Sequence, residues 1–147
     1  SRRERGGWYV IIGGMRLRWM LVVWLFAILF PVAMFRQFWP AFRRQFDAIF
    51  YPDWIHVLVH IILFAGFTLL LSWNYRIALS PARAAGVLLA ALGVGILQEA
   101  LQTISQQIFW LPGVLFDLGI DLAGGILGLL IWRLFGAKIT GSGQASD

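Results

Sequence analysis

Two histidines and three carboxylates interrupt stretches of this chain that are otherwise almost entirely apolar. They are His56, His60, Glu99, Asp117 and Asp121. A bilayer strongly disfavours ionisable side chains, so such groups usually face a partner or a cavity and are functional-site candidates by default. Histidine changes charge near neutral pH, and carboxylates are common proton donors and acceptors. The set suits proton transfer, the binding of a polar ligand, or hydrogen bonding that holds membrane helices together.

The spacing of these residues places them on shared helix faces. His56 and His60 are four residues apart, as are Asp117 and Asp121. Residues four apart lie one above the other on a helix. On the helix that carries Glu99, Gln102 follows three residues later and shares its face. We therefore expect each helix to present its polar groups in one direction.

Glycines at helical spacing predict where helices pack closely. One stripe continues the helix face of the two aspartates and consists of Gly124 and Gly128. The second lies on the preceding apolar stretch and consists of Gly86 and Gly93, which are seven residues apart. Small residues let neighbouring backbones approach within a membrane. We expect the helix of the aspartates to lie centrally along its own stripe.

The composition excludes a water-soluble domain. Of 147 residues, 60% are hydrophobic and only 13% are charged, whereas a soluble domain carries about 25% charged residues. The chain is expected to be a single integral membrane domain. Its net charge of +5 is attributed to arginines that orient membrane helices, because no nucleic-acid-binding motif is present. The absence of cysteine excludes disulfides and thiolate chemistry.

Hydropathy predicts an all-α bundle of four transmembrane helices. A spanning helix needs about 20 apolar residues, and four stretches approach this length: 19–35, 54–73, 84–101 and 112–135. A short interfacial helix is expected between the first two, within 36–53. The corresponding divisions are a cytoplasmic or interfacial segment 1–18, a transmembrane domain 19–135 and a flexible tail 136–147.

The basic residues predict the orientation of these helices. Nine fall on one side of the expected spans, namely Arg2, Arg3, Arg5, Arg16, Arg18, Arg76, Arg83, Arg133 and Lys138, and three on the other, namely Arg36, Arg43 and Arg44. The positive-inside rule then places both termini in the cytoplasm. All five ionisable groups fall in the outer half, which favours a single outward-opening polar pocket.

Most tryptophans lie near expected helix ends and suit an aromatic belt at the membrane interface. Trp24 is the exception, because it lies in the middle of the first apolar stretch. A mid-span tryptophan is a candidate for contact with a partner.

Several other roles are open for these residues. His60 can hold two helices together through Glu99, and Arg43 or Arg44 can neutralise the aspartates. Metal ligation, or ligation of a chlorin magnesium by His60, is a further alternative. However, the Glu-x-x-His motif of di-iron bundles and the His-Glu-x-x-His motif are missing. No metal or cofactor is therefore predicted, and no complete catalytic set is visible, which favours a protein that is not an enzyme.

Three blocks resemble the VanZ-like family of small bacterial membrane proteins. They are His60-Ile-Ile-Leu-Phe-Ala-Gly-Phe-Thr-Leu-Leu, Gly95-Ile-Leu-Gln-Glu-Ala-Leu-Gln102 and Phe116-Asp-Leu-Gly-Ile-Asp-Leu-Ala-Gly-Gly-Ile-Leu-Gly128. The resemblance covers roughly residues 50–132. The positions that match the family are His60, Glu99, Gln102, Asp117, Gly124 and Gly128.

The chain also departs from the family pattern. His56 and Val57 stand where the family usually has Asp and Lys, and Asp121 stands at its asparagine position. The usual arginine between the second and third blocks is absent, with Gln106-Gln107 nearby. These differences remove basic groups from the site and add an acid.

The resemblance implies a multi-pass protein of the bacterial cytoplasmic (inner) membrane, in a family associated with low-level resistance to the glycopeptide teicoplanin. We expect an outer-leaflet pocket for a polar headgroup or cell-wall precursor, with membrane lipids as partners. An accessory subunit of a larger bioenergetic or pigment-bearing membrane complex is the alternative. An enzyme acting on a lipid-linked substrate ranks third.

Overall fold

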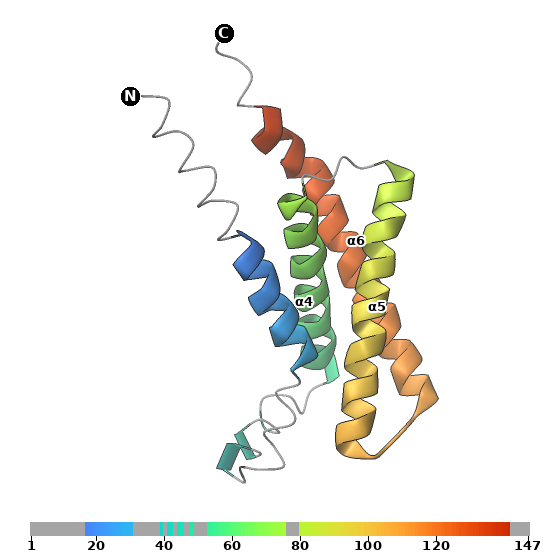
Figure 1. Cartoon of the computed structure of the whole chain (residues 1–147). Helices are drawn as coiled ribbons and strands as arrows, with labels where there is room; N and C mark the ends of the chain where they lie inside the picture. The colour runs from blue at the N-terminus through green and yellow to red at the C-terminus, as the bar shows by residue number, and fades with distance from the viewer. Residues whose placement is uncertain are drawn as a thin grey trace.

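Figure 1 shows a computed structural model of the chain, which is helical and has no strand in the residues it describes. These residues are 17–30, 39, 41–42, 44–45, 48, 53–75 and 80–141. Its main helices are Leu17–Leu29, α4 Asp53–Asn74, α5 Pro81–Gln106 and α6 Leu111–Gly141. The predicted all-α class is thus confirmed for the described part of the chain.

Helices α4, α5 and α6 are long and apolar enough to cross a membrane. The 22 residues of α4 rise about 33 Å at roughly 1.5 Å per residue, which covers a hydrocarbon core of about 30 Å. Large apolar side chains point outward from all three helices, among them Ile62, Leu89 and Leu130. Because an aqueous surface would not be lined in this way, the fold indicates a membrane protein.

The first helix is shorter than the expected span 19–35. It begins at Leu17, ends at Leu29 and is followed by a bend at Phe30. Phe30 precedes Pro31, and a residue before proline is disfavoured in the helical conformation. A fourth spanning helix is therefore not confirmed. The interfacial helix expected within 36–53 lies largely outside the described residues.

The last two helices extend beyond the stretches that hydropathy predicts. The Ser80 side chain accepts a hydrogen bond from the backbone N–H of Arg83, and Pro81 begins α5, a combination that favours a helix start. α5 ends where Gln107 adopts a left-handed conformation with φ 55°. α6 continues through 136–141, so the expected flexible tail begins as helix. The predicted helix ends follow the limits of the apolar stretches. The observed helices are longer because backbone hydrogen bonding continues beyond these limits.

α4 and α6 form the closest helix pair, α5 packs mainly on α6, and α4 and α5 touch least. Glycines make the α4–α6 approach possible: a methyl group on Gly124 would lie 2.7 Å from the Ile61 carbonyl oxygen, and one on Gly128 would overlap the Ala65 carbonyl. At the same place Thr68 Oγ lies 3.0 Å from the Gly125 carbonyl oxygen. The Thr68 hydroxyl therefore donates a hydrogen bond across to a helix backbone that only glycines allow to come this close.

The Leu17–Leu29 helix lies against α4. Its buried Ile28 packs with Phe64 and Phe67 of α4 and with Ala91 of α5. The indole N–H of Trp24 donates a 2.7 Å hydrogen bond to the Leu63 carbonyl. The indole ring lies against Gly66, where a methyl group would overlap it. The mid-span tryptophan thus has its partner inside the chain.

The connections bring three helix ends together. α4 begins, α5 ends and α6 begins at the same end of the bundle (Figure 1). Every ionisable residue of the predicted pocket lies near that end, because His56 and His60 come early in α4, Glu99 late in α5, and Asp117 and Asp121 early in α6.

Candidate functional site

Two histidine–aspartate pairs join α4 to α6. His56 Nε2 lies 3.1 Å from Asp117 Oδ1, and His60 Nδ1 lies 2.7 Å from Asp121 Oδ1. Because each pair is one helical turn from the other on both helices, the four side chains form a ladder in register. The centroids of the two imidazole rings lie 4.4 Å apart, and the ring planes are tilted by 44° to each other.

The two pairs of the ladder differ in exposure: the first is partly exposed and the second is buried. In the first pair the His56 side chain is 43% exposed and that of Asp117 is 16% exposed. In the second pair the exposed fractions fall to 6% for His60 and 1% for Asp121. A ligand arriving at this end therefore meets His56 and Asp117 first, while the deeper pair is enclosed by protein.

Glu99 reaches the same cluster from α5. Its residue is 8% exposed, and it lies close enough to both aspartates and both histidines to interact with them electrostatically. Helices α4, α5 and α6 thus contribute to one site, as the sequence analysis expected of the shared depth. The predicted stretch 84–101 would place Glu99 in the last turn of its helix, but α5 continues to Gln106.

Three oxygens in and beside the cluster have no hydrogen-bond partner among the described residues. They are Oε1 of Glu99, Oδ2 of Asp121 and Oε1 of Gln98, all fully enclosed. Buried polar atoms are nearly always hydrogen-bonded, and the cost of leaving one unpaired is greatest where no water reaches. These atoms therefore mark a place where a proton, an ion or a ligand donor fits.

Two residues that the sequence analysis did not count as site candidates help to build the cluster. Gly95 holds α5 against α6, since a methyl group there would lie 2.8 Å from Asp121 Oδ2. Gln98 is buried beside Glu99. The signal for Gly95 was available, because it lies four residues before Glu99 and so shares its helix face.

An open apolar groove adjoins Glu99 between α5 and α6. Its volume is about 370 Å³, and besides Glu99 it is lined by Ile96, Ala100, Thr103, Ile104, Phe109, Val114 and Leu118. Glu99 is the only carboxylate among these lining residues. It therefore stands between an apolar surface that faces the membrane and the polar ladder behind it.

Three of the predicted residues lie outside this cluster. Gln102 is partly buried on the next turn of α5, and its backbone carbonyl accepts a hydrogen bond from Ser105. Gly86 and Gly93 face open space, with nothing within 4 Å of a methyl group placed on either. The close packing expected at these two glycines is not found in the part of the chain that the structure describes, because α5 turns its other side toward α6.

Two of the proposed pairings do not occur in the described residues. The partner of His60 is Asp121, not Glu99. The aspartates meet histidines instead of arginines: Arg44 is exposed, and Arg43 lies outside the described residues. The reason is the arrangement of the helices, since α6 lies closer to α4 than α5 does.

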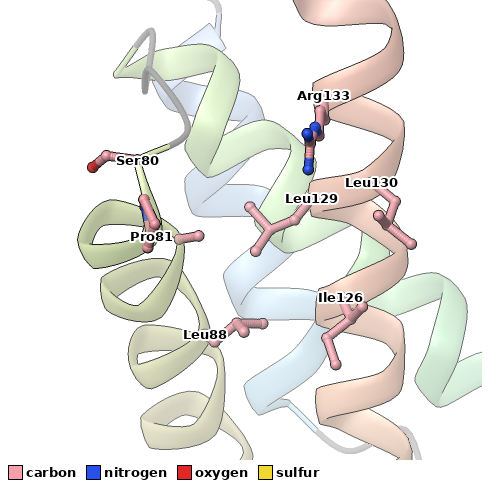
Figure 2. A pocket seen from close by; sticks show the side chains of 8 residues that line it. Ser80, Pro81, Leu88, Ile126, Leu129, Leu130 and Arg133 are labelled. Carbon is pink, nitrogen blue, oxygen red and sulfur yellow. The ribbon is translucent and has the colours of Figure 1, made fainter.

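A second groove lies at the other end of the α5–α6 pair. Figure 2 shows it between Ser80 and Pro81 at the start of α5 and Arg133 in the second half of α6. Its volume is about 270 Å³, and the walls between these residues are apolar, formed by Ala84, Leu88, Ile126, Leu129 and Leu130. The described lining of this groove carries a base, whereas the groove at the histidine end carries an acid.

Comparisons of the chain with protein-family models, with curated proteins and with solved structures find no match. The chemistry of the site is therefore the basis for a function. It combines imidazole donors and acceptors, carboxylates with free oxygens, and an apolar groove beside them.

Proposed function

We propose that the chain is a VanZ-like protein of the bacterial cytoplasmic membrane that binds an amphiphilic component of the cell envelope at its outer end. The observation that supports this most is the position of Glu99. It contributes to the wall of the open apolar groove and it interacts with the buried histidine–aspartate ladder. A ligand with an apolar chain and a polar head fits both environments at once.

The groove suits the apolar part of such a ligand. Ligand sites are typically concave, mostly apolar and provided with a few polar groups that fix orientation. Here the polar group is Glu99, and the remaining lining is almost wholly apolar. An acyl or polyprenyl chain that leaves the surrounding lipid for the groove exchanges one apolar environment for another. The polar head therefore supplies the selectivity.

The charge of the site selects the kind of head. Glu99, Asp117 and Asp121 carry acceptor oxygens, and two of these oxygens have no donor in the described residues. A head that offers hydroxyl, amide or ammonium hydrogens satisfies them. The sugar and peptide parts of a lipid-linked cell-wall precursor have this donor-rich chemistry. The positive-inside rule places the site in the outer leaflet, where such a head is exposed.

Susceptibility to teicoplanin tests the proposal in cells. We expect expression of the chain to raise the inhibitory concentration in a susceptible bacterial host, and Glu99→Gln to abolish the increase. Leu97→Ala is the matched control, because Leu97 is exposed on the same helix and is 48% accessible. Both variants must be present in the membrane at the level of the unchanged protein. Full resistance from Glu99→Gln at equal levels would contradict the proposal.

Direct binding separates the ligand from the phenotype. The purified protein in mild detergent should retain a lipid-linked cell-wall precursor in native mass spectrometry, and Glu99→Gln should lose it while Leu97→Ala keeps it. Equal retention by both variants would show that the groove does not recognise the head.

The alternative, an accessory subunit of a larger membrane complex, is favoured by one observation. Gly86 and Gly93 present an open face on α5, whereas Gly124 and Gly128 are fully covered by α4. Small residues on an exposed helix face are typical of a contact with another helix. Purification in mild detergent distinguishes the two ideas: co-purifying chains that Gly93→Leu removes support a subunit, and a monomer that keeps its lipid supports the binding protein.

A further inference from the structure

We propose that His56, His60 and Asp117 bind a divalent transition-metal ion of the zinc type at the outer end of α4 and α6. Each of the three side chains offers one ligand atom, and these atoms lie within 4.8 Å of one another. The spacing along the sequence does not reveal this set, because two ligands come from α4 and the third from α6. The structure brings them together through the close α4–α6 packing.

The distances allow coordination without moving the backbone. Zinc bonds to histidine nitrogen and carboxylate oxygen are about 2.0–2.2 Å long, so ligands around a tetrahedral ion stand roughly 3.3 Å apart. His56 Nε2 and Asp117 Oδ1 are already 3.1 Å apart. The third ligand atom lies within 4.8 Å of these two. Three protein ligands leave one position of the tetrahedron for water or a ligand group, as in zinc sites that stay open.

Asp121 supplies the support that metal-binding histidines usually have. Such a histidine commonly donates its other ring N–H to a carboxylate, which fixes the tautomer and the orientation of the ring. His60 Nδ1 lies 2.7 Å from Asp121 Oδ1, and Asp121 is 1% exposed. This contact leaves Nε2 of His60 as the metal-binding nitrogen. Asp121 is thus a positioning residue and Asp117 the carboxylate ligand.

Charge and access favour a cation at the same place. The charged groups that act on Glu99 are Asp117, Asp121 and the two histidines. The three carboxylates Glu99, Asp117 and Asp121 lie together in an apolar surrounding. A divalent ion bound here offsets two negative charges. The ligands His56 and Asp117 form the more exposed pair of the ladder, with side chains 43% and 16% exposed. An ion can therefore reach this pair from the outer end.

Zinc titration of the purified protein tests the site. After treatment with a chelator, the full chain in mild detergent should bind one Zn²⁺ per chain in isothermal titration calorimetry, and elemental analysis should recover the same ratio. His56→Ala and Asp117→Ala should each weaken the affinity by more than tenfold. Asp121→Asn should weaken it by 10-fold to 100-fold, the usual effect of removing a supporting carboxylate. Gly119→Ala is the control, since nothing lies within 4 Å of a methyl group there.

The outcomes separate a metal site from a structural ladder. His56 is half-exposed, so His56→Ala keeps the fold even if the buried variants do not, and an unchanged zinc affinity in this variant overturns the proposal. A ratio far below one ion per chain does the same. The site does not depend on the proposed amphiphile, because the probe is Zn²⁺ alone. Glu99→Gln, which removes no ligand, should keep zinc affinity within tenfold while it loses the precursor.

Discussion

His60 of α4 and Asp121 of α6 form an enclosed side-chain pair, with Nδ1 and Oδ1 2.7 Å apart and exposed fractions of 6% and 1%. An ionised carboxylate only accepts hydrogen bonds, so beside an ionised Asp121 the ring nitrogen carries the hydrogen. Each residue is the partner that lets the other lie within the membrane. The pair is therefore both a link between two helices and the fixed base of the site.

Removing both members of this pair should cost less than the sum of the two single removals. We expect Asp121→Ala or His60→Ala to lower the free energy of unfolding by about 3 kcal/mol, the usual cost when a buried charged partner is left alone. The double variant His60→Ala with Asp121→Ala leaves neither member unpaired and should cost less than this sum. Thermal unfolding in mild detergent measures the cycle. Additive costs would show that the two side chains do not stabilise each other.

The approach of α5 to the site should depend on Gly95. A methyl group there would lie 2.8 Å from Asp121 Oδ2 and 3.0 Å from a Leu118 methyl carbon. We expect Gly95→Ala to destabilise the fold by about 1–3 kcal/mol, as overpacking does. Gly93→Ala on the same helix meets nothing within 4 Å and should be neutral or stabilising by up to about 1 kcal/mol. Equal unfolding temperatures for both variants would contradict the α5–α6 contact.

Local spacing predicted the parts of the site that one helix determines. His56 and His60 share a face because residues four apart always do in a helix, and the apolar stretches set the end of the bundle at which each polar group lies. The pairing between helices was not accessible in this way. A bond from His60 to Glu99 is one of the roles that the sequence leaves open, but α6 lies closer to α4 than α5 does. The order of helices in space depends on side-chain packing across the whole bundle.

The glycine stripes show the same limit. Gly86 and Gly93 have the pattern of a packing face just as Gly124 and Gly128 do, yet only the second pair is covered within the chain. The glycine pattern indicates that a neighbouring helix can pack closely at that face. The rotation of α5 about its axis determines whether a helix of this chain packs there. For the first helix, hydropathy alone extended the span to residue 35, whereas the helix ends at Leu29, shortly before a proline.

The α4–α6 contact should require Gly128. A methyl group there would overlap the Ala65 carbonyl and the Thr68 hydroxyl, and backbone atoms do not give way as a flexible side chain does. We expect Gly128→Ala to cost about 1–3 kcal/mol and to weaken the histidine–aspartate contacts above it. Gly119→Ala, on the open side of the same helix, serves as control. If Gly128→Ala unfolds at the temperature of the control, the helices are farther apart than described.

Trp24 should attach the Leu17–Leu29 helix to α4. Its indole N–H donates to the Leu63 carbonyl at 2.7 Å, and Phe lacks this donor. We expect Trp24→Phe to cost about 1 kcal/mol, the typical net value of one hydrogen bond, measured by thermal unfolding. Trp19→Phe is the matched control because Trp19 is 64% exposed. A larger loss from Trp19→Phe than from Trp24→Phe would contradict this attachment.

The orientation of the site can be tested with single cysteines, because the chain has none of its own. The 26 residues of α5 rise about 39 Å, enough to place its two ends on opposite sides of a hydrocarbon core of about 30 Å. The arginine distribution predicts that the end near the polar cluster lies outside. A membrane-impermeant maleimide added to intact cells should therefore label Trp110→Cys, in the connection after α5, and should not label Ala82→Cys in its first turn until the membrane is permeabilised. Labelling of Ala82→Cys alone in intact cells would show the reverse orientation. The histidine–aspartate ladder would then lie in the inner leaflet, which excludes an envelope ligand that is exposed only on the outer side.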